Sequence, residues 1–124
     1  MIGLTFDTGA LIALERHRVR MRKILEYARI VHQPITVPAD VVAEWWRGHT
    51  DARRAILDCV DVEPLTEELA RRAGEAMAAV AKATVVDAIV MASAASRGDV
   101  VYTSDVDDLD ALRRHFPNVR ILGV

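Results

Sequence analysis

The sequence predicts an α/β fold, a sandwich with a mainly parallel central sheet flanked by helices. Short apolar runs rich in β-branched residues recur along the chain, and helical patterns separate each run from the next. Strands separated by helices pair in parallel through right-handed crossovers. The 124 residues suit one core, and they show no internal repeat, low-complexity tract or linker. We therefore expect residues 1–124 to form a single domain.

Each element is predicted from its pattern of apolar and turn residues. The expected elements are a strand at 2–7, a short helix at 8–15, a helix at about 18–31, a strand at 35–37, a helix at 39–48, a helix at 51–59, an extended piece at 60–65, a helix from 67 to about 81, a helix at 85–98, a strand at 100–103, a helix ending near 115 and a strand at 119–124.

Capping residues and apolar stripes refine these helices. Thr66 is a good N-cap, and Glu67 and Glu68 follow it where the helix dipole favours negative charge. Gly48 and Gly98 are expected to end helices. The helix at 18–31 is expected to place one set of apolar residues on a single face: Val19, Ile24, Leu25, Ala28 and Val31. The helix that follows Thr66 is expected to bury a stripe formed by Leu65, Leu69, Ala73, Met77 and Val80.

Composition excludes several classes of protein. Apolar residues make up 52% of the chain and charged residues 27%, which is ordinary globular composition rather than disorder. No apolar run approaches the ~20 residues of a membrane span, and MIGLTFDTG does not resemble a signal peptide. Cys59 is the only cysteine, so an intrachain disulfide and a cysteine-based zinc site are excluded. We expect a cytoplasmic protein.

The net charge of −2 hides an uneven distribution of basic residues. All but two of the sixteen lysines and arginines are arginine, and five basic residues fall in 16-RHRVRMRK-23. Arginine suits bidentate contact with phosphate. Arginines that merely solvate helix surfaces explain the same composition. If the acidic residues bind cations, however, the rest of the chain is more positive than the formal charge indicates.

Four acidic residues from distant parts of the chain are expected at one edge of the sheet. Asp7 and Asp105 end two parallel strands, Asp87 lies near the start of a helix, and Glu44 lies in the first turns of the helix after the second strand. In such sheets ligands bind outside the carboxyl ends of the strands. Each acid also has a simpler explanation, because Asp87 and either Asp105 or Asp107 could cap helices and Glu44 could be a surface charge.

Asp7 is the hardest of these acids to explain structurally. An acid that ends an apolar first strand tends to be partly buried, and a buried carboxylate needs a partner. No basic residue is expected near it, so a bound cation is the simplest compensation. Carboxylates without cysteine or a spaced histidine pair favour Mg²⁺ or Mn²⁺, which support phosphoryl chemistry. Asp108 and Asp110 are more simply solvated acids in a first helical turn.

The assembled pattern resembles the PIN-domain ribonucleases, specifically the VapC-type toxins of toxin–antitoxin pairs. The resemblance covers essentially the whole chain, and four segments carry it in order: 5-TFDTGALIALER-16, 36-TVPADVVAEWWRG-48, 83-ATVVDAIVMASA-94 and 100-VVYTSDVDDL-109. The last two are the most specific. The resemblance implies a PIN-like α/β/α sandwich over residues 1–124.

The resemblance also implies a site. Asp7, Glu44, Asp87 and Asp105 match the four acidic catalytic and metal-binding positions, and Asp107 matches a position where a further acid often stands near the metals. Asp108 matches a less critical position. The hydroxyl residues that would border the metals are Thr8, Thr84, Thr103 and Ser104.

The implied function is Mg²⁺- or Mn²⁺-dependent endonucleolytic cleavage of a cellular RNA such as a tRNA or rRNA. The implied partners are a second copy in a homodimer and a cognate VapB-type antitoxin that covers the helices near the metals, with the apolar faces of 18–31 and 39–47 as candidate surfaces. The residues do not name the RNA, and they do not decide which of Arg16, Arg18, Arg20 and Arg47 hold it. Trp45 and Trp46 could stack on bases, but packing in a core or a dimer interface is the more common use of such residues.

Two other functions fit parts of the pattern. A phosphoacceptor signalling domain also uses an aspartate at a strand end with Mg²⁺, but neither Lys23 nor Lys82 falls at the end of a late strand, where such domains need a lysine. A PIN-fold module with weak or no catalysis could act by binding RNA or protein alone. The complete set of acids argues against this second alternative.

Overall fold

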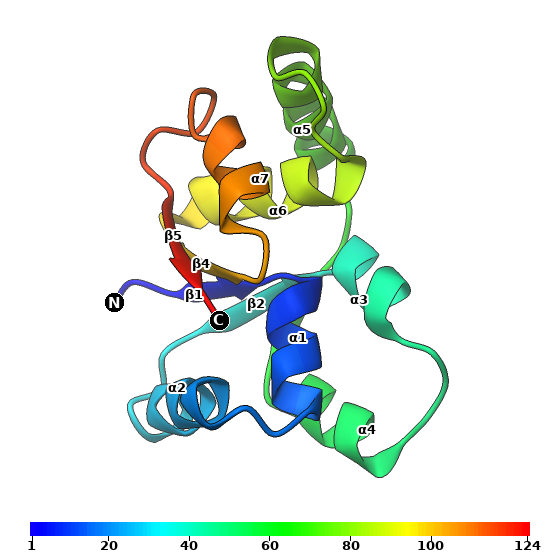
Figure 1. The fold of residues 1–124 in the computed structure, drawn as a ribbon, viewed down its shortest axis with the longest axis vertical. Coiled ribbons are helices and arrows are strands. Elements are labelled where there is room, and N and C mark those ends of the chain that lie inside the picture. The colour runs from blue at the N-terminus through cyan, green and yellow to red at the C-terminus, as the bar shows by residue number, and fades with distance from the viewer.

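The computed structural model describes residues 1–124 and contains five strands and seven helices. In chain order the elements are β1 (Leu4–Phe6), α1 (Thr8–Glu15), α2 (Val19–Ile30), β2 (Ile35–Pro38), α3 (Ala39–Trp45), α4 (Asp51–Asp58), β3 (Asp61–Glu63), α5 (Glu67–Ala79), α6 (Val85–Arg97), β4 (Val100–Thr103), α7 (Val106–Leu112) and β5 (Arg120–Gly123). Helices α5, α6 and α7 cover one face of the sheet, and α1, α2 and α4 cover the other (Figure 1). The α/β sandwich is the predicted fold class.

All neighbouring strands pair in parallel, in the order β3-β2-β1-β4-β5. Leu4 of β1 lies opposite Ile35 of β2 on one side and Val100 of β4 on the other. From β1 the chain leads toward β2, and from β4 it leads toward β5, so the connections diverge between β1 and β4. In open parallel sheets the ligand crevice forms at such a point, outside the carboxyl ends of the strands.

Helix α6 forms the centre of the core. Seven consecutive residues, from 88 to 94, are buried, because the sheet lies on one side of the helix and α5 and α7 lie on the others. A helix that is apolar all round is expected in such a position. Its alanines allow close approach to β1, β2 and β4. Because α6 belongs to a crossover, it runs antiparallel to the strands and brings its N-terminus to their carboxyl ends.

Two of the predicted caps, Thr66 and Gly98, are confirmed. The Thr66 hydroxyl accepts a hydrogen bond from the Leu69 N–H at 3.2 Å, and Gly98 ends α6 in the left-handed conformation at φ 73°. Thr84, rather than Asp87, is the N-cap of α6, because its hydroxyl accepts from the Asp87 N–H at 3.1 Å. The side chain of Asp87 is therefore not needed as a cap.

Four sequence predictions differ from the structure in detail. The helix expected at 39–48 ends at Trp45, and Gly48 lies in the following loop with φ 110°. The Val19 side chain of α2 is 67% exposed, whereas Met21, which was not predicted to be buried, is fully buried. Leu65 is exposed and precedes α5. Within the extended piece expected at 60–65, only Asp61–Glu63 pairs as a strand, β3 at the edge of the sheet.

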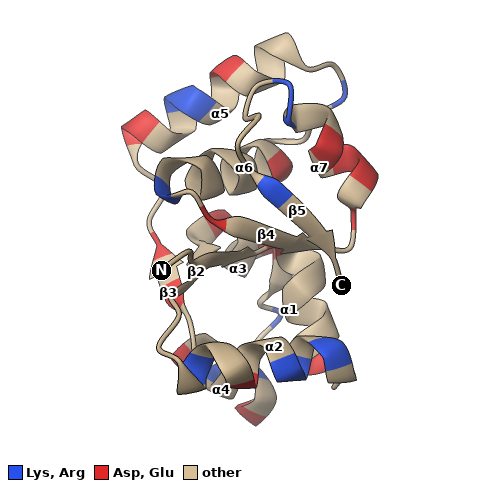
Figure 2. Cartoon of the chain, turned by 90° about the vertical axis from the view of Figure 1, so that its left-hand side faces the viewer, with Lys and Arg blue, Asp and Glu red and all other residues tan.

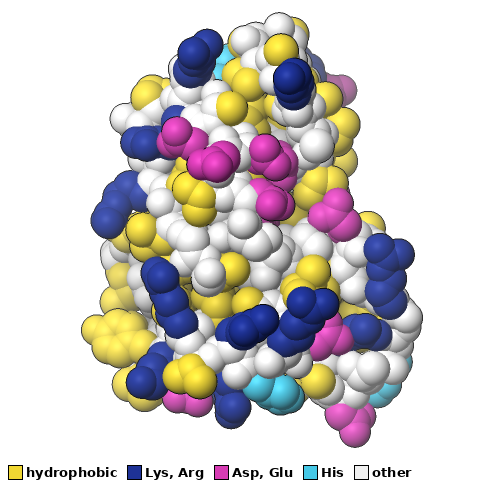
Figure 3. Space-filling view, viewed as in Figure 1, with side chains coloured by type: hydrophobic (Ala, Val, Ile, Leu, Met, Phe, Trp, Pro, Cys, Tyr) yellow, Lys and Arg dark blue, Asp and Glu magenta, His cyan; other side chains and the backbone are white.

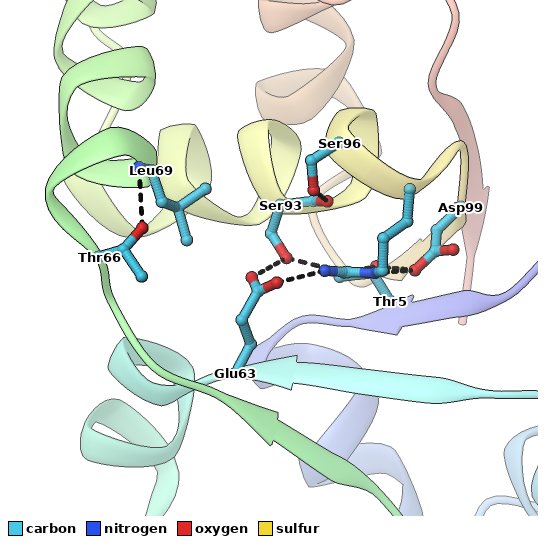
Figure 4. A network of polar contacts seen from close by, with 8 residues as sticks. Thr5, Glu63, Thr66, Leu69, Ser93, Ser96 and Asp99 are labelled. Atoms are coloured by element: carbon cyan, nitrogen blue, oxygen red, sulfur yellow. Dashed lines mark hydrogen bonds and ion pairs between the residues drawn. The ribbon is translucent and has the colours of Figure 1, made fainter.

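A polar network ties the C-terminus of α6 to the sheet (Figure 4). The Arg97 guanidinium donates to Asp99 at 2.9 Å, to Ser93 at 2.8 Å and to Thr5 at 3.1 Å, and it forms an ion pair with Glu63. Asp99 and Thr5 are buried, and the Thr5 hydroxyl donates to Asp99 at 2.8 Å. These contacts compensate the buried Asp99 charge and link β1, β3 and α6 to the residue that precedes β4.

Charged side chains are distributed unevenly over the elements (Figure 2). Basic residues gather on α2, which carries four of them and one acid, and acidic residues gather on α7.

None of the seven helices combines the length and the hydrophobicity that a membrane crossing requires.

Candidate metal centre

Asp7 lies at the carboxyl end of β1 and is 4% exposed. Its carboxylate accepts a hydrogen bond from the Ala10 N–H at 2.9 Å and so caps α1, while its own N–H donates to the Tyr102 carbonyl of β4 at 3.2 Å. No lysine or arginine forms an ion pair with it. Asp7 is thus a buried acid with no basic partner, as the sequence analysis expects.

Burial raises the pKa of Asp7 to about 6. Hydrogen bonds from the Thr103 side chain and the Ala10 backbone oppose this rise, and the negative charges of Asp87 and Asp105 add to it. Loss of hydration penalises the ionised carboxylate, and neighbouring carboxylates penalise it further. A cation at this position would relieve both costs.

Asp87 and Asp105 reach the same edge from two other elements. Asp87 is the third residue of α6 and is half-buried, and Asp105 follows β4 immediately before α7. Burial raises the pKa of Asp87, its hydrogen bond with Thr84 lowers it, and the charges of Asp105, Asp108 and Glu44 raise it again. The carboxylates from β1, α3, α6 and the β4–α7 region are therefore close enough to repel one another.

Glu44 is the fourth acid, and it belongs to α3. It is exposed and lies in the second turn of α3, the helix that follows β2. The Thr8 hydroxyl at the start of α1 donates a short hydrogen bond to it. This contact joins α3 to the helix that Asp7 caps and holds the Glu44 carboxylate toward the other acids.

The remaining predicted residues border the acids in different ways. Thr103 is buried and accepts a hydrogen bond from the Asp105 N–H at 2.8 Å, which orients the start of the β4–α7 turn. Ser104 is exposed in this turn. Asp107 and Asp108 are exposed in the first turn of α7, where the helix dipole favours them.

As the side chains lie, no three acidic, histidine or cysteine groups meet closely enough to hold one metal ion. The donor set nevertheless fits a hard divalent cation, because it consists of carboxylates around a buried acid whose charge has no basic partner. The residues present therefore suit Mg²⁺ or Mn²⁺.

Two residues beside the site were missed in the sequence. Both carboxylate oxygens of Asp40, in the first turn of α3, are buried without a hydrogen-bond partner. Burial raises the pKa of Asp40, and the charges of Glu44 and Glu63 raise it further. Its spacing of four residues from Glu44 places both acids on one face of α3, and this helical spacing could have identified it.

Gly9 is the second missed residue. A Cβ atom there would lie 2.0 Å from the Ser104 hydroxyl and 2.9 Å from the Ser104 backbone nitrogen. Only glycine allows the first turn of α1 to approach the β4–α7 turn this closely. The close contact brings Asp7 and Asp105 to one place, and a glycine directly after 7-DT-8 is a weak but readable sign of it.

Comparison with known families decides the classification. A model of the PIN domain matches residues 4–114. The chain belongs to the PIN domain family. No curated protein matches this PIN domain closely enough to extend the comparison by sequence.

Solved structures share the fold of this PIN domain. DNA-bound VapBC from Salmonella typhimurium aligns with a TM-score of 0.73 and 17% identity, covering 99% of this chain and 98% of that one. VapBC2 from Rickettsia felis, bound to a promoter DNA fragment, gives 0.76 and 14%, covering 100% and 99%. A toxin–antitoxin complex from Klebsiella pneumoniae gives 0.68 and 21%, covering 94% and 95%. At these identities the similarity shows a common fold.

Proposed function

We propose that this PIN domain is a metal-dependent endoribonuclease, the toxin of a VapBC-type toxin–antitoxin pair, that hydrolyses phosphodiester bonds of a cellular RNA such as a tRNA or rRNA. The observation that carries the proposal is the buried, unpaired Asp7 carboxylate at the point where the connections diverge, with Asp87 and Asp105 beside it. A buried carboxylate ordinarily has a cationic partner, and Asp7 has hydrogen bonds but no basic residue to offset its charge.

The acidic and hydroxyl residues of the site have different proposed roles. Asp7, Asp87 and Asp105 would hold Mg²⁺ or Mn²⁺, with Asp107 at the rim and Glu44 either holding a second ion or orienting the attacking water. A divalent ion in such a site lowers the pKa of a bound water and offsets negative charge on the phosphate. Thr8 fixes the Glu44 carboxylate, and the Thr103 hydroxyl fixes the turn that carries Asp105. The expected products have 5′-phosphate and 3′-hydroxyl ends.

Cleavage mapping tests the activity. Wild-type protein and Asp7→Asn are incubated with total cellular RNA in Mg²⁺, in Mn²⁺ and in EDTA, and new 5′ ends are sequenced. We expect discrete cuts with wild type and metal only. Cuts that persist in Asp7→Asn or in EDTA would contradict the proposal, because they would not depend on the acids or the metal.

A PIN-fold module that binds RNA or protein without cleaving is the alternative, and the separation of the acids in this structure is the observation that favours it. Growth inhibition on expression distinguishes the two functions. Inhibition that disappears in Asp7→Asn supports the nuclease, whereas inhibition that Asp7→Asn retains, together with intact RNA, supports the binding module.

The proposed partners follow from the relatives. Several structural neighbours are toxin–antitoxin complexes, which supports a VapB-type antitoxin as the partner of this chain. We further propose that the chain forms a homodimer and that residues 1–124 form one domain. Strand β5 lies outside the matched residues 4–114 but pairs with β4, which supports a single domain. Mass determination in solution, with and without a co-expressed antitoxin, tests both assemblies.

A further inference from the structure

Two surface hollows flank helix α1 and adjoin the acidic site. The first, the α3 hollow, lies between α1, α3 and α4 and is lined by Thr8, Glu44, Arg16, Arg47 and Arg53 among others. The second, the α2 hollow, lies between α1, α2 and the β4–α7 turn and is lined by Gly9, Ser104, Arg16, Arg18 and Arg20 among others. Each hollow therefore contains residues that border the acids at one end of α1 and arginines at its other end.

The same arrangement is visible on the surface. In Figure 3, acidic side chains gather on the upper part of the face, and a row of lysine and arginine side chains crosses the face below them. The chain as a whole carries a net charge of −2, so this row is a local concentration of positive charge and not a general property.

Most of these arginines have no acidic partner. Arg53 forms an ion pair with Glu15 at 2.9 Å, and Glu15 also accepts a hydrogen bond from the Trp45 indole at 3.1 Å. By contrast, the exposed side chains of Arg16, Arg18, Arg20 and Arg47 make no hydrogen bond or ion pair within the chain. Arg53 is thus a structural cation, and the other four are available to a ligand.

Arg16 occupies the central position among them. It is the C-cap of α1 and lines both hollows. His17 follows with a left-handed φ of 58°, which turns the chain so that Arg16 and Arg18 stand on either side of one tight corner. Asp7 and Arg16 cap the two ends of α1 and are nine residues apart, so their backbones lie about 13 Å apart along the helix axis. This separation places Arg16 beside a flanking phosphate and not beside the phosphate that is cleaved.

We propose that Arg16 is a phosphate-binding positioning residue, which, with Arg47 in the α3 hollow and Arg18 and Arg20 in the α2 hollow, holds the sugar–phosphate backbone of single-stranded RNA on either side of α1. The proposal rests on the proposed ribonuclease function, because that function requires a phosphodiester at the acids next to both hollows. An acidic protein segment offers similar charges, but it has no such reason to pass the acids that border both hollows. Planar guanidinium groups suit bidentate contact with phosphate.

Binding without catalysis tests the proposal separately from the nuclease activity. Fluorescence anisotropy of a labelled single-stranded oligouridylate is measured in EDTA over a series of KCl concentrations, for wild type, Arg16→Ala, Arg16→Lys and Arg114→Ala. Arg114 is the matched control, because it is exposed, makes no ion pair and follows α7 on the other face of the sheet. Thermal melting of each variant establishes that it is folded.

We expect Arg16→Ala to weaken binding about tenfold, as the removal of one charge-assisted hydrogen-bonding group predicts. The slope of log K against log salt should decrease in magnitude by about 0.7 for each phosphate that the variant no longer neutralises. Arg16→Lys should keep most of the slope, and Arg114→Ala should leave it unchanged. In a cleavage assay with metal, Arg16→Ala should raise KM and leave kcat nearly unchanged, because Arg16 does not touch the reacting phosphate.

Three results would overturn the proposal. The first is an unchanged affinity and slope in Arg16→Ala, and the second is a complete lack of oligouridylate binding by the wild-type chain at low salt. The third is unchanged RNA binding in Arg16→Ala together with abolished binding of a polyglutamate peptide, which would assign the arginines to an acidic protein partner. Each result can occur while metal-dependent cleavage persists, so failure of this proposal is distinguishable from failure of the nuclease.

Discussion

The carboxylate of Asp7 affects the stability of the protein in two opposite ways. It caps α1 through the Ala10 N–H, which favours the folded state. Its burial favours the protonated form and raises its pKa to about 6, so the ionised group makes the folded state less favourable at neutral pH. A site that binds cations retains this cost, because the charge that destabilises the metal-free protein is the charge that attracts the ion.

Asp7→Asn should therefore stabilise the metal-free protein. Asparagine keeps an oxygen that can accept from Ala10 but carries no charge. Because the folded protein binds its proton more tightly than the unfolded chain does, stability contributed by Asp7 is highest below about pH 4 and falls as the pH rises to about 6. The advantage of Asp7→Asn should be small at pH 4 and reach about 3 kcal/mol above pH 7.

Urea unfolding in EDTA from pH 4 to pH 8 measures this difference. Glu75→Gln, an exposed change on α5, is the control and should leave the pH profile nearly unchanged. An advantage of Asp7→Asn that stays constant with pH would mean that ionisation of Asp7 is not the cause.

At the residue scale, the sequence identified the acids better than it identified their surroundings. Asp7 and Asp105 were predictable because each ends an apolar run, and parallel strands end at a common edge. Gly9 was missed because its importance depends on Ser104, which lies far away in the chain. Asp40 was missed because its burial depends on the packing of α3 and on the distant charge of Glu63, although its helical spacing from Glu44 was readable. Val19 was misassigned because helical periodicity fits several rotations of α2 about equally well, and the packing that buries Met21 decides among them.

Two glycines in helices have opposite expected effects at the scale of the elements. Gly9→Ala should destabilise the protein by about 1–3 kcal/mol, because the new methyl group would force α1 away from the β4–α7 turn. Gly74→Ala on α5 is the matched control. No atom lies within 4 Å of the position that its new methyl group would take, so it should be neutral or stabilise the protein by up to about 1 kcal/mol. Chemical denaturation of both variants measures the contrast, and equal effects would contradict it.

The Arg97 network should be essential for the attachment of α6 to the sheet. Arg97→Ala would leave the buried Asp99 without its cation and Glu63 without its ion pair. Breaking such a pair on one side costs about 3–5 kcal/mol, and the partial exposure of Arg97 reduces this to about 2–3 kcal/mol. Arg71→Ala, which removes only an exposed pair with Glu67 on α5, should change the free energy of unfolding by less than about 0.5 kcal/mol. A similar loss in both variants would show that the network adds nothing specific.

The ends of elements were predictable where local chemistry determines them. Thr66 and Gly98 act through contacts within a few residues, so their roles could be inferred from the sequence. Helix α3 ends three residues before Gly48 for a non-local reason. Trp45 is buried, and its indole N–H donates a hydrogen bond to Glu15 of α1. The backbone of the next residue, Trp46, is extended. Tertiary packing here overrides the local helical preference of residues 46–48.

At the scale of the whole molecule, the parallel sheet and the edge that carries the acids followed from the alternation of strands and helices. The strand order did not follow, because the chain must pass from β3 at one edge across β2 and β1 to β4. That long crossover through α5 and α6 brings Asp87 from 80 residues away to the neighbourhood of Asp7. Only the folded chain shows that β1 and β4 are neighbours and that the acidic crevice lies between their connections.

Metal binding should be detectable as a gain in the stability of the whole molecule. The acids repel one another and do not meet around one position without an ion, so binding must draw them together. An ion that binds only the folded state stabilises it according to its concentration relative to Kd, by about 1.4 kcal/mol at ten times Kd. For a chain of 124 residues that corresponds to a rise in Tm of about 5 °C.

Differential scanning fluorimetry with millimolar Mg²⁺ or Mn²⁺ measures the rise, with KCl at equal ionic strength as the control for screening. The rise should increase between about pH 5 and pH 7, because the ion requires an ionised Asp7 and must displace its proton. Asp7→Asn should begin at a higher Tm than wild type in EDTA and gain little from metal. The Tm values of the two proteins should therefore approach each other as metal is added. An equal metal-dependent rise in both proteins would place the ion elsewhere on the acidic surface and remove Asp7 from the centre.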